Sequence, residues 1–165
     1  MTLAPVIALR PITPADHPLL LEIFASTREA EMARVPWSPE QKAAFLGMQF
    51  QAQHADYQRN YPDASFDVIE QDGVPAGRLY VHRRPEEIRV IDIALLPAFR
   101  GQGLGTRFLT ELIEEAAATA RVVSIHVEKN NPALRLYQRL AFEPVADTGV
   151  HLLMRHTPQS LPSRP

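Results

Sequence analysis

The sequence predicts a single α/β domain with a mixed sheet, and three observations lead to that class. Strand-like and helix-like segments follow one another in the order β-α-α-β-β-β-α-β-α-β-β. The chain has 165 residues, of which 45% are hydrophobic, enough for one substantial core. No internal repeat and no linker divides it. We therefore expect one domain over residues 1–156 and a disordered tail over residues 157–165.

The amino-terminal part is predicted to hold one strand and two helices. The run "VIALRPIT" is short, apolar and interrupted by Pro11, which is typical of a strand. Thr13 is a suitable N-cap, and apolar residues recur at helical spacing after it, so the segment over residues 13–33 is predicted to contain the first helix. Glu31, near the end of this segment, is expected in the loop region after that helix. The sequence Ser38-Pro39-Glu40-Gln41 begins a second helix.

The rest of the chain is predicted to be richer in strands. Strands at residues 65–71 and 74–84 form a hairpin through Asp72-Gly73, and β-branched residues favour a third strand at 88–96. A helix, a strand and a short helix follow at 105–120, 121–128 and 130–142. Residues 143–156 resemble a final hairpin that turns at Thr148-Gly149.

Composition excludes several classes of function. The net charge is −2 and no basic run is present, which argues against a nucleic-acid-binding domain. There are no cysteines, so disulfides, thiolate chemistry and cysteine-ligated zinc are excluded, and no two histidines lie four residues apart as metal ligands do. No apolar stretch is long enough for a membrane span, and no signal peptide is evident. We expect a soluble, cytoplasmic protein without a metal.

The stretch "FRGQGLGTRF", residues 99–108, contains three glycines just before and at the start of a predicted helix. Glycines let the backbone approach a ligand closely, and helix amino termini bind phosphate through unpaired N–H groups. The dinucleotide pattern fails because Thr106 stands where glycine is needed, and no Gly-Lys-Ser/Thr tripeptide is present. The pattern R-x-x-G-x-G over residues 100–105 therefore indicates another pyrophosphate ligand, unless the glycines only form a tight cap.

Two motifs make the chain resemble the GNAT superfamily of N-acetyltransferases. The stretch "DIALLPAFRGQGLGTRFL" resembles the acetyl-CoA-binding motif of that superfamily. The run from Asn130 to Tyr137 matches N-x-x-A-x-x-L-Y, and Ala141-Phe142 follows where the family often has Gly-Phe. The resemblance covers about residues 5–156. Because Ala141 falls at a helix end, where glycine eases a left-handed turn, we expect this departure to leave the chemistry unchanged.

The resemblance implies a fold, a reaction and a cofactor site. The implied fold is a mostly antiparallel sheet of six to seven strands flanked by about four helices, with one parallel strand pair splayed at the cofactor. The implied reaction is direct attack of an amine on the thioester of acetyl-CoA. The residues implied to bind the cofactor are Ala94, Leu95, Leu96, Arg100, Gly101, Gln102, Gly103, Leu104, Gly105, Thr106, Asn130 and Tyr137.

Four residues are candidates for chemistry or for acceptor binding. Tyr137 matches the family tyrosine near the thioester sulfur, where a phenol can protonate the thiolate, although a core tyrosine is the alternative. Asp92 interrupts an apolar strand and is either the base or a satisfied structural acid. Glu31 either takes the proton of the amine, binds the amine or is simply solvated. Trp37 either walls the acceptor pocket or packs in the core.

Other functions stay open at this stage. A non-catalytic acyl-CoA-binding module is the main alternative to an acetyltransferase, and a longer acyl chain is a third possibility. His82 and His126 lie in predicted strands, where each is either a proton relay or a residue bonded to a neighbour. The acceptor is expected to be a small-molecule or peptide amine, with no nucleic-acid or membrane partner. Analogy with the superfamily suggests a homodimer.

Overall fold

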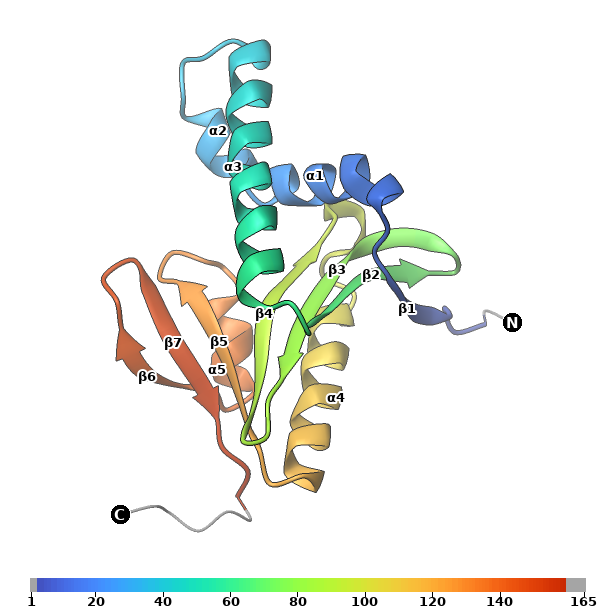
Figure 1. Ribbon diagram of the computed structural model, residues 1–165, viewed down its shortest axis with the longest axis vertical. Helices are drawn as coiled ribbons and strands as arrows, with labels where there is room; N and C mark the ends of the chain where they lie inside the picture. The colour runs from blue at the N-terminus through green and yellow to red at the C-terminus, as the bar shows by residue number, and fades with distance from the viewer. Residues whose placement is uncertain (1–2, 160–165) are drawn as a thin grey trace. The chain divides into compact units, whose positions relative to one another are not determined.

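The computed structural model of the chain describes residues 3–159 (Figure 1). The strands are β1 (Ile7–Pro11), β2 (Ser65–Gln71), β3 (Val74–Arg83), β4 (Glu87–Leu95), β5 (Val122–Glu128), β6 (Glu143–Asp147) and β7 (His151–His156). The α-helices are α1 (His17–Ser26), α2 (Glu29–Ala33), α3 (Pro39–Asn60), α4 (Leu104–Ala118) and α5 (Leu134–Arg139). Two 3₁₀ turns are η1 (Pro14–Asp16) and η2 (Pro97–Phe99).

The strands form a seven-stranded sheet in the order β1-β2-β3-β4-β5-β7-β6. β4 and β5 pair in parallel, whereas the pairs β1–β2, β5–β7 and β6–β7 are antiparallel. The predicted fold class and order of elements are confirmed, with one refinement. The helix expected within residues 13–33 is divided, because the N–H groups of Thr27 and Arg28 bond three residues back and end α1 before α2 begins.

The described chain divides into two compact units, each with its own packing. The first unit comprises residues 3–79 and 94–100, and the second comprises residues 80–93 and 101–159. This division leaves the prediction of one domain over residues 1–156 untested. Of the predicted tail, residues 157–159 form no helix or strand, and the remainder lies outside the described residues.

The first unit holds α1 against α3, which cross one another in Figure 1. Its apolar core consists of buried residues from α1, α3 and the end of β4: Leu20, Ile23, Phe24, Phe50 and Ala94. The predicted cap of α3 is confirmed, since Ser38 Oγ accepts the Gln41 N–H at 3.2 Å and Gln41 Oε1 accepts the Ser38 N–H at 2.9 Å. The predicted Asp72-Gly73 turn is also confirmed, with φ of +52° and +78°.

The second unit packs α4 against β5, and β5, β7 and β6 lie side by side in Figure 1. The helix predicted over residues 105–120 is confirmed as α4, and Phe108, Leu109, Leu112 and Ala116 are buried on one face of it. Alternate residues of β5 are buried with them: Val123, Ile125 and Val127. No helix in residues 3–159 is both long and apolar enough to cross a membrane.

Candidate functional site

The amino terminus of α4 offers backbone groups rather than side chains to a ligand. Gly101 and Gly103 have φ of +73° and +84°, a region that strains any L side chain. The first intrahelical bond runs from the Arg107 N–H to the Gly103 carbonyl at 3.0 Å, and no side chain caps the helix. The N–H groups of residues 104–106 precede that bond and are left for an external acceptor. This arrangement fits an anion such as a diphosphate.

Arg100 is held within the first unit. Its Nε donates to the Leu95 carbonyl at 2.9 Å, and its Nη2 donates to the Ser26 carbonyl and hydroxyl, each at 3.2 Å. Two of the three guanidinium nitrogens therefore tie the end of α1 to the end of β4. The contact between Arg100 and a diphosphate stays a prediction. The third guanidinium nitrogen would have to make that contact.

The end of β4 lies very close to β3. A Cβ placed on Gly77 would lie 2.2 Å from the Ala94 carbonyl oxygen and 3.0 Å from the Leu95 Cα, so only glycine fits there. The Leu96 N–H donates to the Ala76 carbonyl at 2.8 Å, and the Leu96 carbonyl accepts the Phe99 N–H at 2.9 Å. Both backbone groups of Leu96 thus have partners within the chain, which leaves Ala94 and Leu95 as the stronger candidates for backbone pairing with pantetheine.

The parallel pairing of β4 with β5 covers only part of each strand. Their pairing runs from Glu87–Val122 to Val90–Ile125, and no further pair follows in the described residues, although β5 extends to Glu128. On its other edge β5 stays paired with β7 as far as Glu128–His151. The edge of β5 beyond Ile125 that faces β4 therefore has backbone groups available to an inserted ligand.

Tyr137 and Asp92 come together in the second unit. The side chain of Tyr137 on α5 is only 4% exposed, and its hydroxyl donates to no group in the described chain. Burial, and next the charge of Asp92, raise the pKa of Tyr137 above its usual range. Tyr137 is therefore a neutral phenol at physiological pH, which is the state required of a proton donor. Asp92 shares a strand face with the buried Ile88 and Val90.

A Schellman motif ends α5 and holds the Tyr137 ring. The Phe142 N–H donates to the Tyr137 carbonyl and the Ala141 N–H to the Gln138 carbonyl, both at 3.0 Å. The rings of Phe142 and Tyr137 meet edge to face, with centroids 5.9 Å apart. Ala141 has φ of +65°, which confirms the left-handed turn expected at this position.

Asn130 lies exposed in the turn before α5. Its side chain makes no hydrogen bond within the described residues, whereas the neighbouring Asn131 Oδ1 accepts the Ala133 N–H at 2.8 Å. Asn131 therefore shapes the turn, and the Asn130 amide is left for a ligand. Its predicted contact with the cofactor stays a prediction.

Glu31 and Trp37 belong to the first unit, on or beside the short helix α2. Glu31 is exposed and lies 3.3 Å from Arg28 Nη1, in α2 rather than in the predicted loop. Trp37 is 41% exposed and meets Phe45 edge to face, with centroids 5.2 Å apart. It lines an open hollow of about 310 Å³ together with Gln41, Ala44, Phe45 and Met48. Its exposure contradicts the core alternative and keeps the acceptor-wall prediction open.

A polar cluster on β4 and β5 was missed by sequence reasoning, apart from His126. Arg89 donates to Ser124 Oγ at 2.7 Å, to Glu87 Oε1 at 3.2 Å and, through Nη1, to His126 Nδ1 at 3.1 Å. Ser124 Oγ in turn donates to Glu87. The alternation of Glu87 and Arg89 along β4 was a signal of a shared face, but the parallel register with Ser124 was not predictable.

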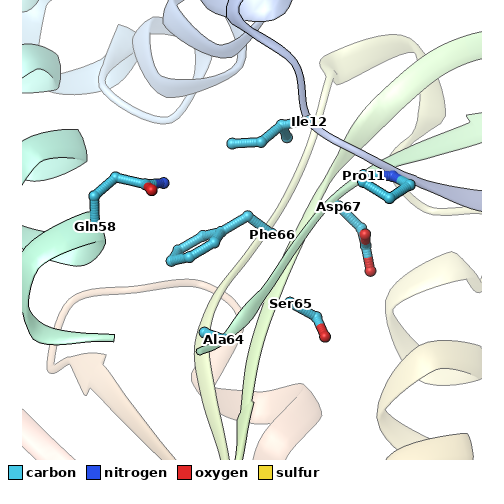
Figure 2. Close-up of a pocket in the computed structure, with 7 residues that line it drawn as sticks. All are labelled: Pro11, Ile12, Gln58, Ala64, Ser65, Phe66 and Asp67. Atoms are coloured by element: carbon cyan, nitrogen blue, oxygen red, sulfur yellow. The ribbon is translucent and has the colours of Figure 1, made fainter. Parts of the chain in front are cut away.

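A second hollow of the first unit is unrelated to these residues. It measures about 340 Å³ and is lined by Pro11, Ile12, Gln58, Ala64, Ser65, Phe66 and Asp67. Figure 2 shows the Phe66 ring directed toward Gln58, with Ser65 and Asp67 pointing away. None of the predicted site residues lines it. Within residues 3–159, no group of three or more His, Cys, Asp or Glu side chains is arranged to hold a metal ion.

Comparison with known families identifies the fold's relatives. Residues 27–142, more than half of the chain, match the model of the "Acetyltransferase (GNAT) family". The chain belongs to the GNAT acetyltransferase family. A proposed ribosomal protein bS18-alanine N-acetyltransferase of Bacillus subtilis is 34% identical over 86 residues, which is 50% of this chain and 56% of that protein. An uncharacterized Mycobacterium leprae protein, ML0378, is matched over only 18% of its length and 39% of this chain, at 38% identity. The matches thus span less than two thirds of the length of these two proteins.

Solved structures share the GNAT fold. The PaiA N-acetyltransferase of Thermoplasma acidophilum, in complex with coenzyme A, superposes with a TM-score of 0.68 at 16% identity, over 92% of this chain and 99% of that one. The ribosomal-protein-S18-alanine N-acetyltransferase of Escherichia coli gives a TM-score of 0.60 at 20% identity, over 96% and 100% of the two chains. These likenesses support the predicted GNAT fold across nearly the whole chain.

Proposed function

We propose that this GNAT-family protein transfers the acetyl group of acetyl-CoA to an amine by direct attack. The observation that carries the proposal is the start of α4, where two left-handed glycines and three uncapped N–H groups fit a diphosphate. This motif follows β4 after the short turn η2, and the parallel pairing of β4 with β5 ends early. By itself this arrangement indicates only an anionic ligand. Membership of the GNAT family supports acetyl-CoA as that ligand.

The cofactor's parts would be bound by different elements. The N–H groups at residues 101–106 would hold the diphosphate, supported by Arg100. Backbone groups of Ala94 and Leu95 would pair with the pantetheine arm, as an added strand pairs with a sheet edge. Asn130, with its exposed amide, would contact the same molecule.

Two protons must move during the reaction. Tyr137 would hydrogen-bond to the departing thiolate and supply its proton, because the raised pKa keeps the buried phenol protonated and able to donate as negative charge develops on the sulfur. Asp92 is the better-supported base of the two acids, since it acts electrostatically on Tyr137 and can take the ammonium proton directly or through water. Glu31, paired with Arg28 on α2, is proposed to attract the amine rather than to deprotonate it.

The acceptor is proposed to be the amino terminus of a protein or peptide. The Bacillus subtilis relative, at 34% identity, is named for acetylation of an alanine on a ribosomal protein, which favours this acceptor over a free small amine. A peptide beginning with alanine is therefore the first substrate to try.

The proposal is tested by calorimetry with acetyl-CoA followed by mass spectrometry of a panel of amines and alanine peptides. We expect binding, and a mass gain of one acetyl group on at least one acceptor. Binding without turnover across the panel would instead favour a non-catalytic acyl-CoA module, and absence of binding would refute the proposal.

A further inference from the structure

Three rings of the second unit contact one another in a row that ends at the proposed acid. The rings of Tyr137 and Phe142 meet edge to face with centroids 5.9 Å apart, and the rings of Phe142 and His156 are tilted at 59° with centroids 5.7 Å apart. Tyr137 and Phe142 are 4% and 3% exposed, and His156 is half-buried. The imidazole is therefore linked to the phenol through the ring of Phe142.

Strand register fixes the position of His156. The first pair of β6 with β7 is Glu143–Arg155. One step further along the same register Phe142 comes beside His156, in agreement with their ring contact. On the other edge of β7, His156 pairs with Val123, which is fully buried in β5. Phe142 belongs to no strand, because it closes the Schellman turn after α5. The end of β7 is thus anchored, and the turn that carries Phe142 packs against it.

The phenol depends on this support because α5 is short. Helix α5 has six residues, and Tyr137 is the single buried residue among them. A helix of so few residues is not stable by itself, so its position is set by the contacts it makes. The Phe142 N–H donates to the Tyr137 carbonyl at 3.0 Å, and the Phe142 ring contacts the Tyr137 ring. A displacement of Phe142 would therefore displace the Tyr137 hydroxyl as well.

An imidazole is an unusual side chain for this position. The Nδ1 atom of His156 is buried and has no hydrogen-bond partner within residues 3–159. An unpaired buried nitrogen costs free energy that an apolar side chain would not. Burial lowers the pKa of His156, so the ring is neutral at pH 7. The contact between His156 and Phe142 is therefore a contact of two neutral rings, and the flat shape of the imidazole is what it contributes.

Resting on the proposed role of Tyr137 in acetyl transfer, we infer that His156 is a positioning residue that holds the phenol in place through Phe142. It acts by the shape of its ring and not by moving a proton. A ring without nitrogen should therefore replace it. Removal of the ring should lower turnover and leave the affinity for acetyl-CoA unchanged, because the diphosphate is proposed to bind at the start of α4.

The first test uses the ligand-free protein and needs no activity. The ring signals of the four tyrosines are followed by NMR in protein with ¹³C-labelled tyrosine, and the signal lost in Tyr137→Phe assigns Tyr137. The chemical shift of Tyr137 depends on where the Phe142 ring lies. We expect His156→Ala to move the Tyr137 signal, and His156→Phe to return it toward its wild-type position. An unmoved signal in His156→Ala would overturn the inference.

The second test is kinetic. We expect His156→Ala to lower kcat about tenfold, with the acetyl-CoA dissociation constant within about twofold, because a small displacement of a reacting group slows the reaction strongly. His156→Phe should keep kcat within about twofold of the wild-type value. In the Tyr137→Phe background His156→Ala should have almost no further effect, since the hydroxyl that it positions is already gone. The control for a general loss of packing is Leu112→Val in the buried face of α4, which should change neither kcat nor the Tyr137 signal.

The outcomes separate this inference from the proposed function. Equal losses of kcat in His156→Ala and His156→Phe would assign the effect to the imidazole nitrogens and overturn the inference. An undiminished effect of His156→Ala in the Tyr137→Phe background would overturn it too, because the effect would then not pass through the phenol.

A second variant covers the case in which His156→Ala does not fold. His156→Leu fills the core without a flat ring and is expected to show the same changes to a smaller extent, and the absence of any change would overturn the inference. If the wild-type protein acetylates no amine and no peptide, the proposed function fails, while the tyrosine spectra still decide whether His156 holds the phenol in place.

Discussion

The start of α4 and the end of α5 both contribute to the proposed site, but they do so by different means. At the start of α4 the functional groups are N–H groups, and the residues before them are glycines with φ of +73° and +84°. At the end of α5 the functional group is one phenol, whose ring is held by a Schellman turn and by Phe142. The first region depends on conformation, and the second depends on one side chain in a supporting frame.

This difference predicts different responses to mutation. A backbone site should be lost through substitutions that change φ, whatever the chemistry of the new side chain. A side-chain site should be lost through removal of a single oxygen atom, with the frame intact. Four substitutions test this contrast, and they are given in order of decreasing expected effect.

The largest effect is expected for Gly103→Val. A β-branched residue is strained at φ of +84°, by about 1 to 3 kcal/mol, and the strain would turn the N–H groups of α4 away from the diphosphate. We expect acetyl-CoA binding, measured by calorimetry, to weaken by about 100-fold or more. The control is Gly73→Val, which has a similar φ of +78° but lies in the β2–β3 turn. Equal loss in both variants would mean general destabilisation and not a lost phosphate site.

The second effect is expected for Tyr137→Phe. Removing the hydroxyl leaves the ring and its contact with Phe142, so the turn should persist. We expect kcat to fall about 100-fold, the lower range for general acid catalysis, with the acetyl-CoA dissociation constant within about twofold. Steady-state kinetics and calorimetry together give the two values. A matching loss of affinity and turnover would reassign Tyr137 to packing.

The third effect concerns the pH dependence of stability. Because the folded-state pKa of Tyr137 is raised, its contribution is present in full below the unfolded value of about 10 and is lost as pH rises beyond it. One proton gives a slope of about 1.4 kcal/mol per pH unit. In Asp92→Asn the negative charge that helps to raise the pKa of Tyr137 is gone, so the loss of stability should be complete at a lower pH. Urea denaturation between pH 9 and pH 12 measures it, and an unchanged curve would mean that Asp92 does not act on Tyr137.

The same contrast explains which features could be predicted from sequence. The glycine stretch, the Ser38 cap and the Asp72-Gly73 turn depend on residues adjacent in the chain, so local rules predicted them. The buried face of α4 follows from helical spacing, which is likewise local. The break between α1 and α2 was missed because it rests on two hydrogen bonds, each from an N–H to the carbonyl three residues earlier. No glycine or proline in the sequence signals these bonds.

Side-chain constellations were harder to predict because they depend on strand register. Arg89 meets Ser124 and His126 only through the parallel pairing of β4 with β5, across more than thirty positions of sequence. Asp92 was identified as an unusual acid in an apolar strand, yet its action on Tyr137 could not be deduced from spacing. Arg100 was predicted by the motif, but its hydrogen bonds to Ser26 arise from packing within the first unit.

The smallest effect, a gain in stability, is expected for Ala141→Gly. Ala141 occupies the left-handed position of the Schellman turn with φ of +65°, where a Cβ costs about 1 to 2 kcal/mol. Glycine removes that cost but loses more conformational entropy on folding, by about 0.5 to 1 kcal/mol. We expect a net gain of about 0.5 to 1 kcal/mol in the free energy of unfolding by urea denaturation, with kcat nearly unchanged, because the Tyr137 hydroxyl is untouched. Ala141→Val should be destabilised by a larger amount, since branching at Cβ adds to the strain. If glycine instead lowered kcat, the turn would be shown to set the position of the phenol as well as the stability of α5, and the contrast between frame and functional group would no longer hold.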